Sequence, residues 1–395
     1  MDRSDEFDLV VAKLRGLTLR IPNLDPIYGR WRHGFNVHYD RLVQSINGHL
    51  EALFQDKTYI EGVKSMDLAQ FVCQVYPSAD WPRLRVMGLY LVGLILFDDE
   101  FDRKMDPDVV DQASDLALAN RYRLDMYSYV ESILAGAAAG ASRRRSKCQV
   151  NKVTPPPVGG FFAAIAPHLL RAASEDVVNM PRLLHDLKFF MGSSNEEQQR
   201  FNMQRKFPTL EQYDAFRAGT GAVDAICDLH QHVSLVFSKI AILWIADTRD
   251  RYVAGARLPD DLTSAEEVMT MRREVNVQTC VSNDLLSLKK EIRDMTLISL
   301  VPIHINARGT SLDEIVDELV REMQRSAASF DAAAEALRER ARHYGQGVVG
   351  ETRRFIDTFE TFQTGCLAFY VKSRRFGVAE YQLPGGSFAI PLSCT

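Results

Sequence analysis

Four carboxylates fall within five positions at residues 98–102, directly after a strongly apolar stretch. Asp98 and Asp102 are four residues apart, so both side chains project from one face if the segment is helical. The C-terminal end of a helix is where the helix dipole opposes negative charge, and a positive partner would offset that cost. A hard divalent cation with oxygen ligands is such a partner. The alternative is a solvated, acid-rich helix end.

A second group of oxygen-bearing side chains repeats at every fourth position, at Asn283, Ser287 and Glu291. On a helix these side chains form one stripe. Asn and Ser compete with the backbone for hydrogen bonds, so helix stability does not explain the pattern. Three oxygen ligands for one divalent ion would explain it, with water or a phosphate completing an octahedron. The alternative is an ordinary polar face, with Lys289 and Lys290 serving solubility.

Together the two groups resemble the aspartate-rich motif and the NSE triad of class I terpene synthases, and Lys290 directly before Glu291 also fits. Residues 213–221 resemble the segment of that family that carries the diphosphate-sensing arginine. Here that residue is Arg217, followed by Thr220 as the linker and Gly221 as the effector at a helix break.

Near the C-terminus, residues 373–376 resemble the Arg-Tyr pair of the same family. Arg375 is kept, but Phe376 stands in place of the tyrosine, so a hydroxyl contact to diphosphate would be lost. The resemblance covers residues 20–380, and it is closest to the single-domain microbial type, fungal or bacterial.

The resemblance implies an all-α, single-domain helical barrel with a central active-site cavity, in which a prenyl diphosphate is ionised and cyclised. We expect farnesyl diphosphate as the substrate and a sesquiterpene as the product, with geranyl and geranylgeranyl diphosphate as the alternative substrates. Three Mg²⁺ ions are expected, with Mn²⁺ as a possible substitute. The implied metal ligands are Asp98, Asp102, Asn283, Ser287 and Glu291. The implied diphosphate-binding positions are Arg217, Lys290, Arg375 and Phe376, where arginine suits phosphate oxygens through its bidentate fork.

An apolar cavity would also have to stabilise carbocations, and aromatic faces can contribute about 0.5–2 kcal/mol each. Phe71, Phe97 and Phe369 are candidates, the last because it would share a helical face with Phe376. Ordinary core packing is the alternative for each. The sequence identifies no base for the final deprotonation, for which diphosphate could serve.

The elements that must position these residues are helices. Apolar residues recur at helical spacing from residue 30 to residue 54 and through 82–101, 113–135, 177–191, 210–230, 265–295, 311–344 and 350–374. Period-two alternation is almost absent. The pattern predicts about ten helices, no convincing sheet and an all-α class, preceded by an irregular N-terminal arm at residues 1–29 that contains Pro22 and Pro26.

Two segments interrupt the helical pattern, residues 136–160 and 234–257. Structureless connections longer than about 12–15 residues are uncommon in compact domains. The intervals from Asp98 to Arg217 and from Arg217 to Asn283 are both longer than in the family pattern, each by about the length of the irregular segment that it contains. The two segments are either surface insertions or translated introns.

Composition narrows the partners and the compartment. A net charge of −5 gives no reason to expect nucleic acid. No apolar run approaches the length of about 18 residues that a membrane span needs, so we expect no stable membrane insertion. Six widely spaced cysteines are typical of a reducing compartment, and we expect a cytoplasmic protein, as a monomer or homodimer.

Two other functions remain open. A chain-elongating prenyl diphosphate synthase would share the fold and metals, but it should carry a second aspartate-rich element where this chain has Asn283, Ser287 and Glu291. A catalytically silent isoprenoid-fold protein is the other, inactive because of the two irregular segments or of Phe376.

Overall fold

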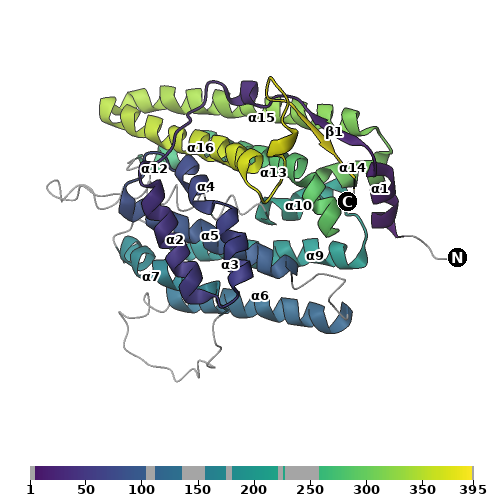
Figure 1. Ribbon diagram of the computed structural model, residues 1–395. Helices are drawn as coiled ribbons and strands as arrows, with labels where there is room; N and C mark the ends of the chain where they lie inside the picture. Colours follow the sequence, from purple (N-terminus) through teal and green to yellow (C-terminus); the bar gives the residue numbers. More distant parts are fainter. Residues whose placement is uncertain are drawn as a thin grey trace.

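The computed structural model describes residues 5–103, 112–135, 156–174, 180–220, 226 and 258–393. These residues are predominantly helical, which confirms the predicted all-α class (Figure 1). The α-helices are α1 (Glu6–Leu14), α2 (Tyr39–Leu53), α3 (Lys57–Ser65), α4 (Leu68–Val75), α5 (Trp81–Arg103), α6 (Gln112–Ala135), α7 (Gly159–Ser174), α8 (Met180–Lys188), α9 (Asn195–Gln204), α10 (Leu210–Thr220), α12 (Asp260–Thr263), α13 (Glu266–Asp294), α14 (Leu300–Arg308), α15 (Leu312–Ala341) and α16 (Gln346–Lys372). Shorter helical turns are η1 (Asp25–Tyr28), η3 (Phe189–Ser194), η4 (Arg342–Tyr344) and η5 (Ala379–Tyr381).

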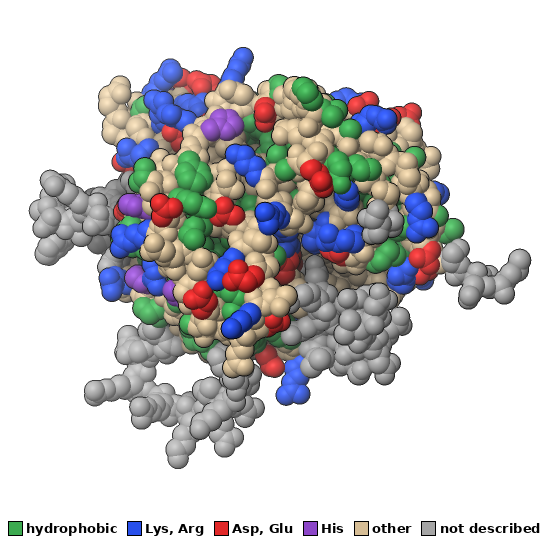
Figure 2. Space-filling model, viewed as in Figure 1, with side chains coloured by type: hydrophobic (Ala, Val, Ile, Leu, Met, Phe, Trp, Pro, Cys, Tyr) green, Lys and Arg blue, Asp and Glu red, His purple; other side chains and the backbone are tan. Residues whose placement is uncertain are grey.

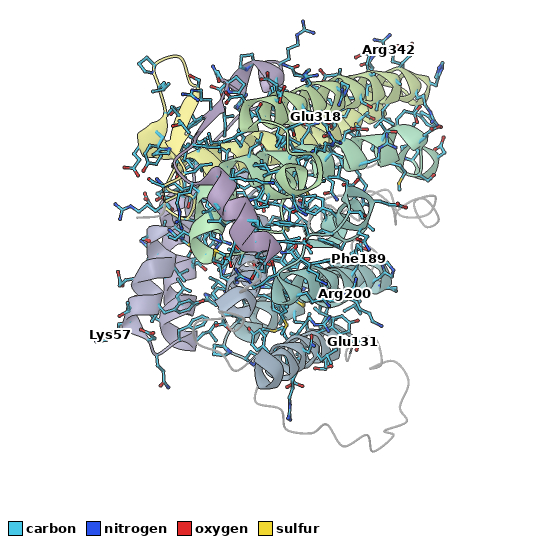
Figure 3. All side chains as sticks on the ribbon, turned by 90° about the vertical axis from the view of Figure 1, so that its right-hand side faces the viewer. Lys57, Glu131, Phe189, Arg200, Glu318 and Arg342 are labelled. Atoms are coloured by element: carbon cyan, nitrogen blue, oxygen red, sulfur yellow. The ribbon has the colours of Figure 1, made fainter. Side chains whose placement is uncertain are left out.

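The long helices form two groups that face each other. α13, α15 and α16 pack side by side in the upper part of Figure 1, and α5, α6 and α7 pack together below them. α9 and α10 pack with η3 at the side, and α10 also contacts α13. In the view turned by 90°, side chains fill the space between the helices, and exposed residues such as Lys57, Glu131 and Arg342 lie at the edge of the helical body (Figure 3).

Helix α5 is buried on nearly all sides, so its buried side chains include the predicted apolar positions and also others such as Val86, Leu89 and Tyr90. Leu84, Met87, Leu91 and Leu94 are buried at the expected helical spacing. Each fully buried side chain of this size contributes about 1.5–3 kcal/mol of burial free energy. This packing fixes the axis of α5 and therefore the direction in which its acidic C-terminal turns point.

The N-terminal segment is more regular than predicted, so the expectation of an irregular arm at residues 1–29 was wrong in part. Helix α1 is capped by Asp5, whose side chain accepts a hydrogen bond from the backbone of Asp8, and the helix buries one apolar face. Strand β1 (Thr18–Ile21) then pairs antiparallel with strand β2 (Phe388–Pro391), with Leu19 opposite Ile390. Both prolines lie beyond the end of β1 and do not interrupt it. The sequence showed no convincing sheet, and this two-stranded pairing was missed because four-residue strands give almost no periodic signal.

Several helices were missed for the same reason. α3, α4 and α14 have nine, eight and nine residues, too few turns for a clear period. Helix α7 begins at Gly159, inside the segment 136–160 expected to be irregular. The rest of that segment up to residue 155, and all of 234–257, lie outside the described residues.

The face of the described part that is seen in Figure 2 is mixed in charge. Lys and Arg side chains are interspersed with Asp and Glu on the face shown in Figure 2. Among the helices that the structure describes, none combines the length and the apolar character needed to cross a bilayer.

A close crossing of α4 and α16 gives a testable stability effect. A Cβ added at Gly365 would lie 2.8 Å from the backbone nitrogen of Val75. Gly365→Ala is therefore expected to lower the free energy of unfolding by about 1–3 kcal/mol in urea denaturation. Gly347→Ala in the same helix is the control, because an added Cβ there meets nothing within 4 Å. It should be neutral or slightly stabilising, and equal losses in both variants would contradict the close crossing.

Candidate active site

A cavity lies between the two groups of helices, and its walls differ in chemistry from one end to the other. Its volume is about 1240 Å³ when its solvent-open mouth is included. At one end the lining is polar, formed by Asp98, Arg217, Thr220, Asn283, Asp284, Ser287, Lys290, Glu291 and Arg375. Elsewhere it is largely apolar, with Phe71, Leu91, Leu94, Ile95, Phe190, Ile226, Phe362, Cys366, Phe369, Tyr370 and Phe376. Such a cavity suits a ligand with an anionic head and a hydrocarbon tail.

The predicted triad lies on the α13 wall of this cavity. The Ser287 hydroxyl oxygen is 2.6 Å from a carboxylate oxygen of Glu291 and 2.7 Å from the backbone oxygen of Asn283. The other carboxylate oxygen of Glu291 accepts a hydrogen bond from Ser299. Burial, and then the nearby charge of Asp284, raise the pKa of Glu291 to about 7. A divalent cation at this wall would favour the charged carboxylate.

Arg217 reaches the same wall from α10. Its Nη2 donates to Asp284 Oδ1 at 2.6 Å and to Asn283 Oδ1 at 3.1 Å. Burial alone would lower the pKa of Arg217, but the adjacent carboxylate of Asp284 outweighs it and the pKa lies above its ordinary value. The buried Nε of Arg217 has no hydrogen-bond partner among the residues that the structure describes. The guanidinium is therefore charged and has a donor to spare for an anionic ligand.

Asp284 is a central residue of the site that the sequence did not reveal. It is 1% exposed, and it accepts hydrogen bonds from the Tyr213 hydroxyl, from the backbone nitrogen of Leu300 at 2.9 Å and from Arg217. One position after Asn283, it is rotated about 100° from the triad stripe. The sequence did contain one signal, since Asp284 is an acid next to Leu285 and Leu286 in a predicted helix. An acid that is buried with such neighbours needs hydrogen-bond or charge partners.

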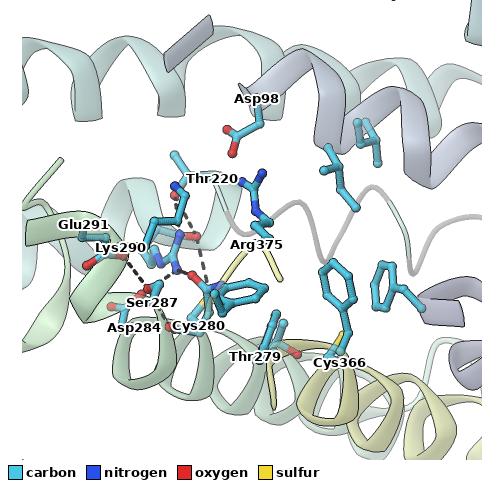
Figure 4. A pocket seen from close by; sticks show the side chains of 18 of the residues that line it. Asp98, Thr220, Thr279, Cys280, Asp284, Ser287, Lys290, Glu291, Cys366 and Arg375 are labelled. Carbon is cyan, nitrogen blue, oxygen red and sulfur yellow. Dashed lines mark hydrogen bonds and ion pairs between the residues drawn. The ribbon is translucent and has the colours of Figure 1, made fainter. Parts of the chain in front are cut away.

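The opposite wall carries the aspartate cluster. Asp98 projects from α5 toward Arg375, across the cavity from Ser287 and Glu291 (Figure 4). Arg375 forms an ion pair with Asp99, a partner that was not predicted. The side chain of Asp102 lies outside the described residues, so its predicted metal contact stays a prediction. Gly221, the predicted effector, also lies outside them, whereas Thr220 lines the cavity.

Two of the predicted diphosphate-binding positions are also in the lining. The Nζ of Lys290 lies 3.6 Å from Oδ2 of Asp294, with which it forms an ion pair. The ring of Phe376 packs against those of Phe369 and Tyr370, with centroids 5.7 Å and 5.0 Å apart. The expectation that Phe369 and Phe376 share a helical face was wrong, because α16 ends at Lys372 and the chain turns back to bring the rings together.

The aromatic candidates separate into two kinds. Phe71 and Phe369 both line the cavity and stack with centroids 4.5 Å apart. Phe97 is fully buried against Tyr122 and Phe190 and is absent from the described lining of the cavity. Phe97 therefore packs in the core, which was the alternative to a role in stabilising the carbocation.

The residues present fit a divalent metal. Asp98 and the triad offer carboxylate, amide and hydroxyl oxygens, which hard cations prefer. Within the described residues no cluster of three or more His, Cys, Asp or Glu side chains forms a metal site. A metal at the triad would therefore depend on Asn283 and Ser287 as well as Glu291, with an anionic ligand completing its coordination.

Known proteins with similar sequences and structures agree with this arrangement. Residues 90–329 match the family described as "Terpene synthase family 2, C-terminal metal binding". The chain is 25% identical over 373 residues to Sesquiterpene cyclase hepA of Aspergillus oryzae, which covers 93% of this chain and 92% of that protein. It is 20% identical over 331 residues to (+)-eremophilene synthase of Sorangium cellulosum, covering 83% and 84% of the two chains.

The fold is shared with solved structures as well. Germacradien-4-ol synthase from Streptomyces citricolor superposes with a TM-score of 0.62 at 18% identity, over 86% of this chain and 96% of that chain. Because the family match extends over more than half of the sequence, this chain belongs to terpene synthase family 2.

Proposed function

We propose that this protein is a Mg²⁺-dependent terpene synthase, a carbon–oxygen lyase acting on phosphates. It ionises farnesyl diphosphate, cyclises the carbocation to a sesquiterpene and releases diphosphate. The observation that carries the proposal is the meeting of Asp98, the α13 triad, Arg217 and Arg375 at one end of a cavity that is largely apolar elsewhere. The names of the sesquiterpene cyclase and eremophilene synthase relatives support the same substrate class.

Each wall has a separate role in this reaction. Asp98, Asn283, Ser287 and Glu291 would hold the metal, and Asp102 is proposed as a further ligand. Bound divalent ions, of which we propose three, supply positive charge that stabilises the departing diphosphate. Arginine and lysine donors at the same end contribute through hydrogen bonds, which strengthen as negative charge develops on the phosphate oxygens.

The apolar lining acts on the hydrocarbon. Phe71 and Phe369 present stacked rings to the cavity, and each aromatic face can stabilise a nearby cation by about 0.5–2 kcal/mol. Leu91, Leu94 and Ile95 exclude water from the same space, which protects a carbocation from early capture. We further propose that the chain forms a single domain, since the β1–β2 pairing joins its two ends.

Product analysis tests this function. Purified protein is incubated with Mg²⁺ and geranyl, farnesyl or geranylgeranyl diphosphate in turn, and volatiles are analysed by mass spectrometry. Farnesyl diphosphate should give a cyclic C15 terpene. No terpene above the no-enzyme control from any substrate would instead indicate a silent isoprenoid-fold protein. A longer prenyl diphosphate formed on adding isopentenyl diphosphate would indicate chain elongation.

A further inference from the structure

In this structure the Arg217 guanidinium lies on an oxygen that a metal at the triad would need. Arg217 Nη2 is 3.1 Å from Asn283 Oδ1, and the same nitrogen is 2.6 Å from Asp284 Oδ1. The amide oxygen of Asn283 is the only atom of that side chain able to coordinate a cation. An arginine donor therefore occupies the predicted ligand atom.

Asp284 is the reason that Arg217 lies there. Its carboxylate is held in place by the Tyr213 hydroxyl and by the backbone nitrogen of Leu300, and it is almost completely buried. A carboxylate with these fixed donors has little freedom to follow Arg217 elsewhere. The Asp284 carboxylate therefore keeps the Arg217 guanidinium next to Asn283 until another anion binds the guanidinium instead.

A guanidinium and a divalent cation on the same amide oxygen repel each other, and the repulsion is strong where water is largely excluded. The arginine donor and a metal ion on the Asn283 oxygen therefore weaken each other's binding. Ser287 and Glu291 do not contact Arg217 through any hydrogen bond found in the described residues, so the conflict concerns the Asn283 oxygen.

We propose that Asp284 is a positioning residue that holds Arg217 on Asn283, so that the arginine and a divalent metal compete for one oxygen. The proposal rests on the proposed function, in which diphosphate gives Arg217 another anion to bind. Substrate binding then draws Arg217 away and frees Asn283, so the triad binds its metal tightly only when diphosphate is present.

Metal binding without substrate tests the competition. Mn²⁺ is titrated into wild-type protein and into Arg217→Met, and bound Mn²⁺ is measured by electron paramagnetic resonance. The same titrations with Asn283→Ala added identify the part of the binding that belongs to the triad. Arg217→Met should bind Mn²⁺ at the triad about tenfold more tightly than wild type, because a charge-assisted hydrogen bond no longer opposes it.

Two further variants separate competition from general electrostatics and from misfolding. Lys290→Met removes a positive charge from the same lining without touching Asn283, and it should tighten binding less than Arg217→Met. Arg217→Met/Asp284→Asn leaves the net charge unchanged and leaves no buried charge unpaired, and it should still tighten binding, by about threefold or more.

The outcomes decide the proposal. Unchanged or weaker Mn²⁺ binding in both Arg217 variants overturns it, as does an equal gain in Lys290→Met. Circular dichroism shows whether each variant is folded. If Arg217→Met is not folded, Mn²⁺ binding to Arg217→Met/Asp284→Asn decides the proposal. Since no prenyl diphosphate is added, the result is independent of turnover, which the product analysis tests separately.

Discussion

Asn283→Ala is expected to lower turnover of farnesyl diphosphate by about a thousandfold, the largest single effect that we predict on activity. The substitution removes the amide oxygen that lies in the polar end of the cavity, one helical turn before Ser287. Without this oxygen the triad would bind its divalent ion less well, and the positive charge of that ion would no longer stabilise the departing diphosphate. Release of inorganic diphosphate, measured alongside volatile terpene, gives the turnover.

Asn276→Ala is the matched control for this substitution. Asn276 lies on α13 and is buried, but it accepts a hydrogen bond from Cys280 and is not among the described residues that line the cavity. Its replacement could lower stability while leaving turnover within a few-fold of wild type. If Asn283→Ala turned over as fast as Asn276→Ala, the triad would have no part in the reaction.

The largest expected effect on stability is at Asp284. Asp284→Ala leaves the Arg217 guanidinium without its carboxylate and removes the acceptor of Tyr213 and of the Leu300 backbone. Breaking a buried ion pair by removing one partner costs about 3–5 kcal/mol. We expect a loss of this size in the free energy of unfolding, measured by urea denaturation.

A second acid on the same helix is the control for that measurement. Asp294 pairs with Lys290 and Arg293 near the C-terminal end of α13, and its side chain is 34% exposed. Asp294→Ala should therefore cost less than about 1 kcal/mol. Adding Arg217→Met to Asp284→Ala should recover part of the loss, because the two residues interact directly. Additive losses would contradict the interaction.

Sequence periodicity was enough to predict the long helices that build the site. The recurring apolar positions of α5 and the four-residue spacing of the triad on α13 both fit the 3.6-residue helical turn. Helix α1 and strand β1 were not predicted, because nine and four residues are too few to show a clear period. Short elements depend on tertiary contacts that a periodic pattern does not contain.

The pairing of charges could not be predicted from sequence. The Arg375–Asp99 ion pair joins residues 276 positions apart, and the Arg217–Asp284 pair joins residues 67 positions apart. Their contacts are set by how α5, α10, α13 and the turn after α16 are packed. Neighbouring acids such as Asp98 and Asp99 differ only in the face that they occupy. The sequence therefore identified the types of residues in the site but not which residues contact each other.

The most direct test of the central claim is the metal dependence of diphosphate release from farnesyl diphosphate. Purified protein is freed of metal with a chelator, and inorganic diphosphate and C15 terpene are followed as Mg²⁺ is added back. We predict no release of either without metal, and equimolar release of both with Mg²⁺. Diphosphate release at the same rate in the presence of the chelator, or none at any Mg²⁺ concentration, would contradict the account.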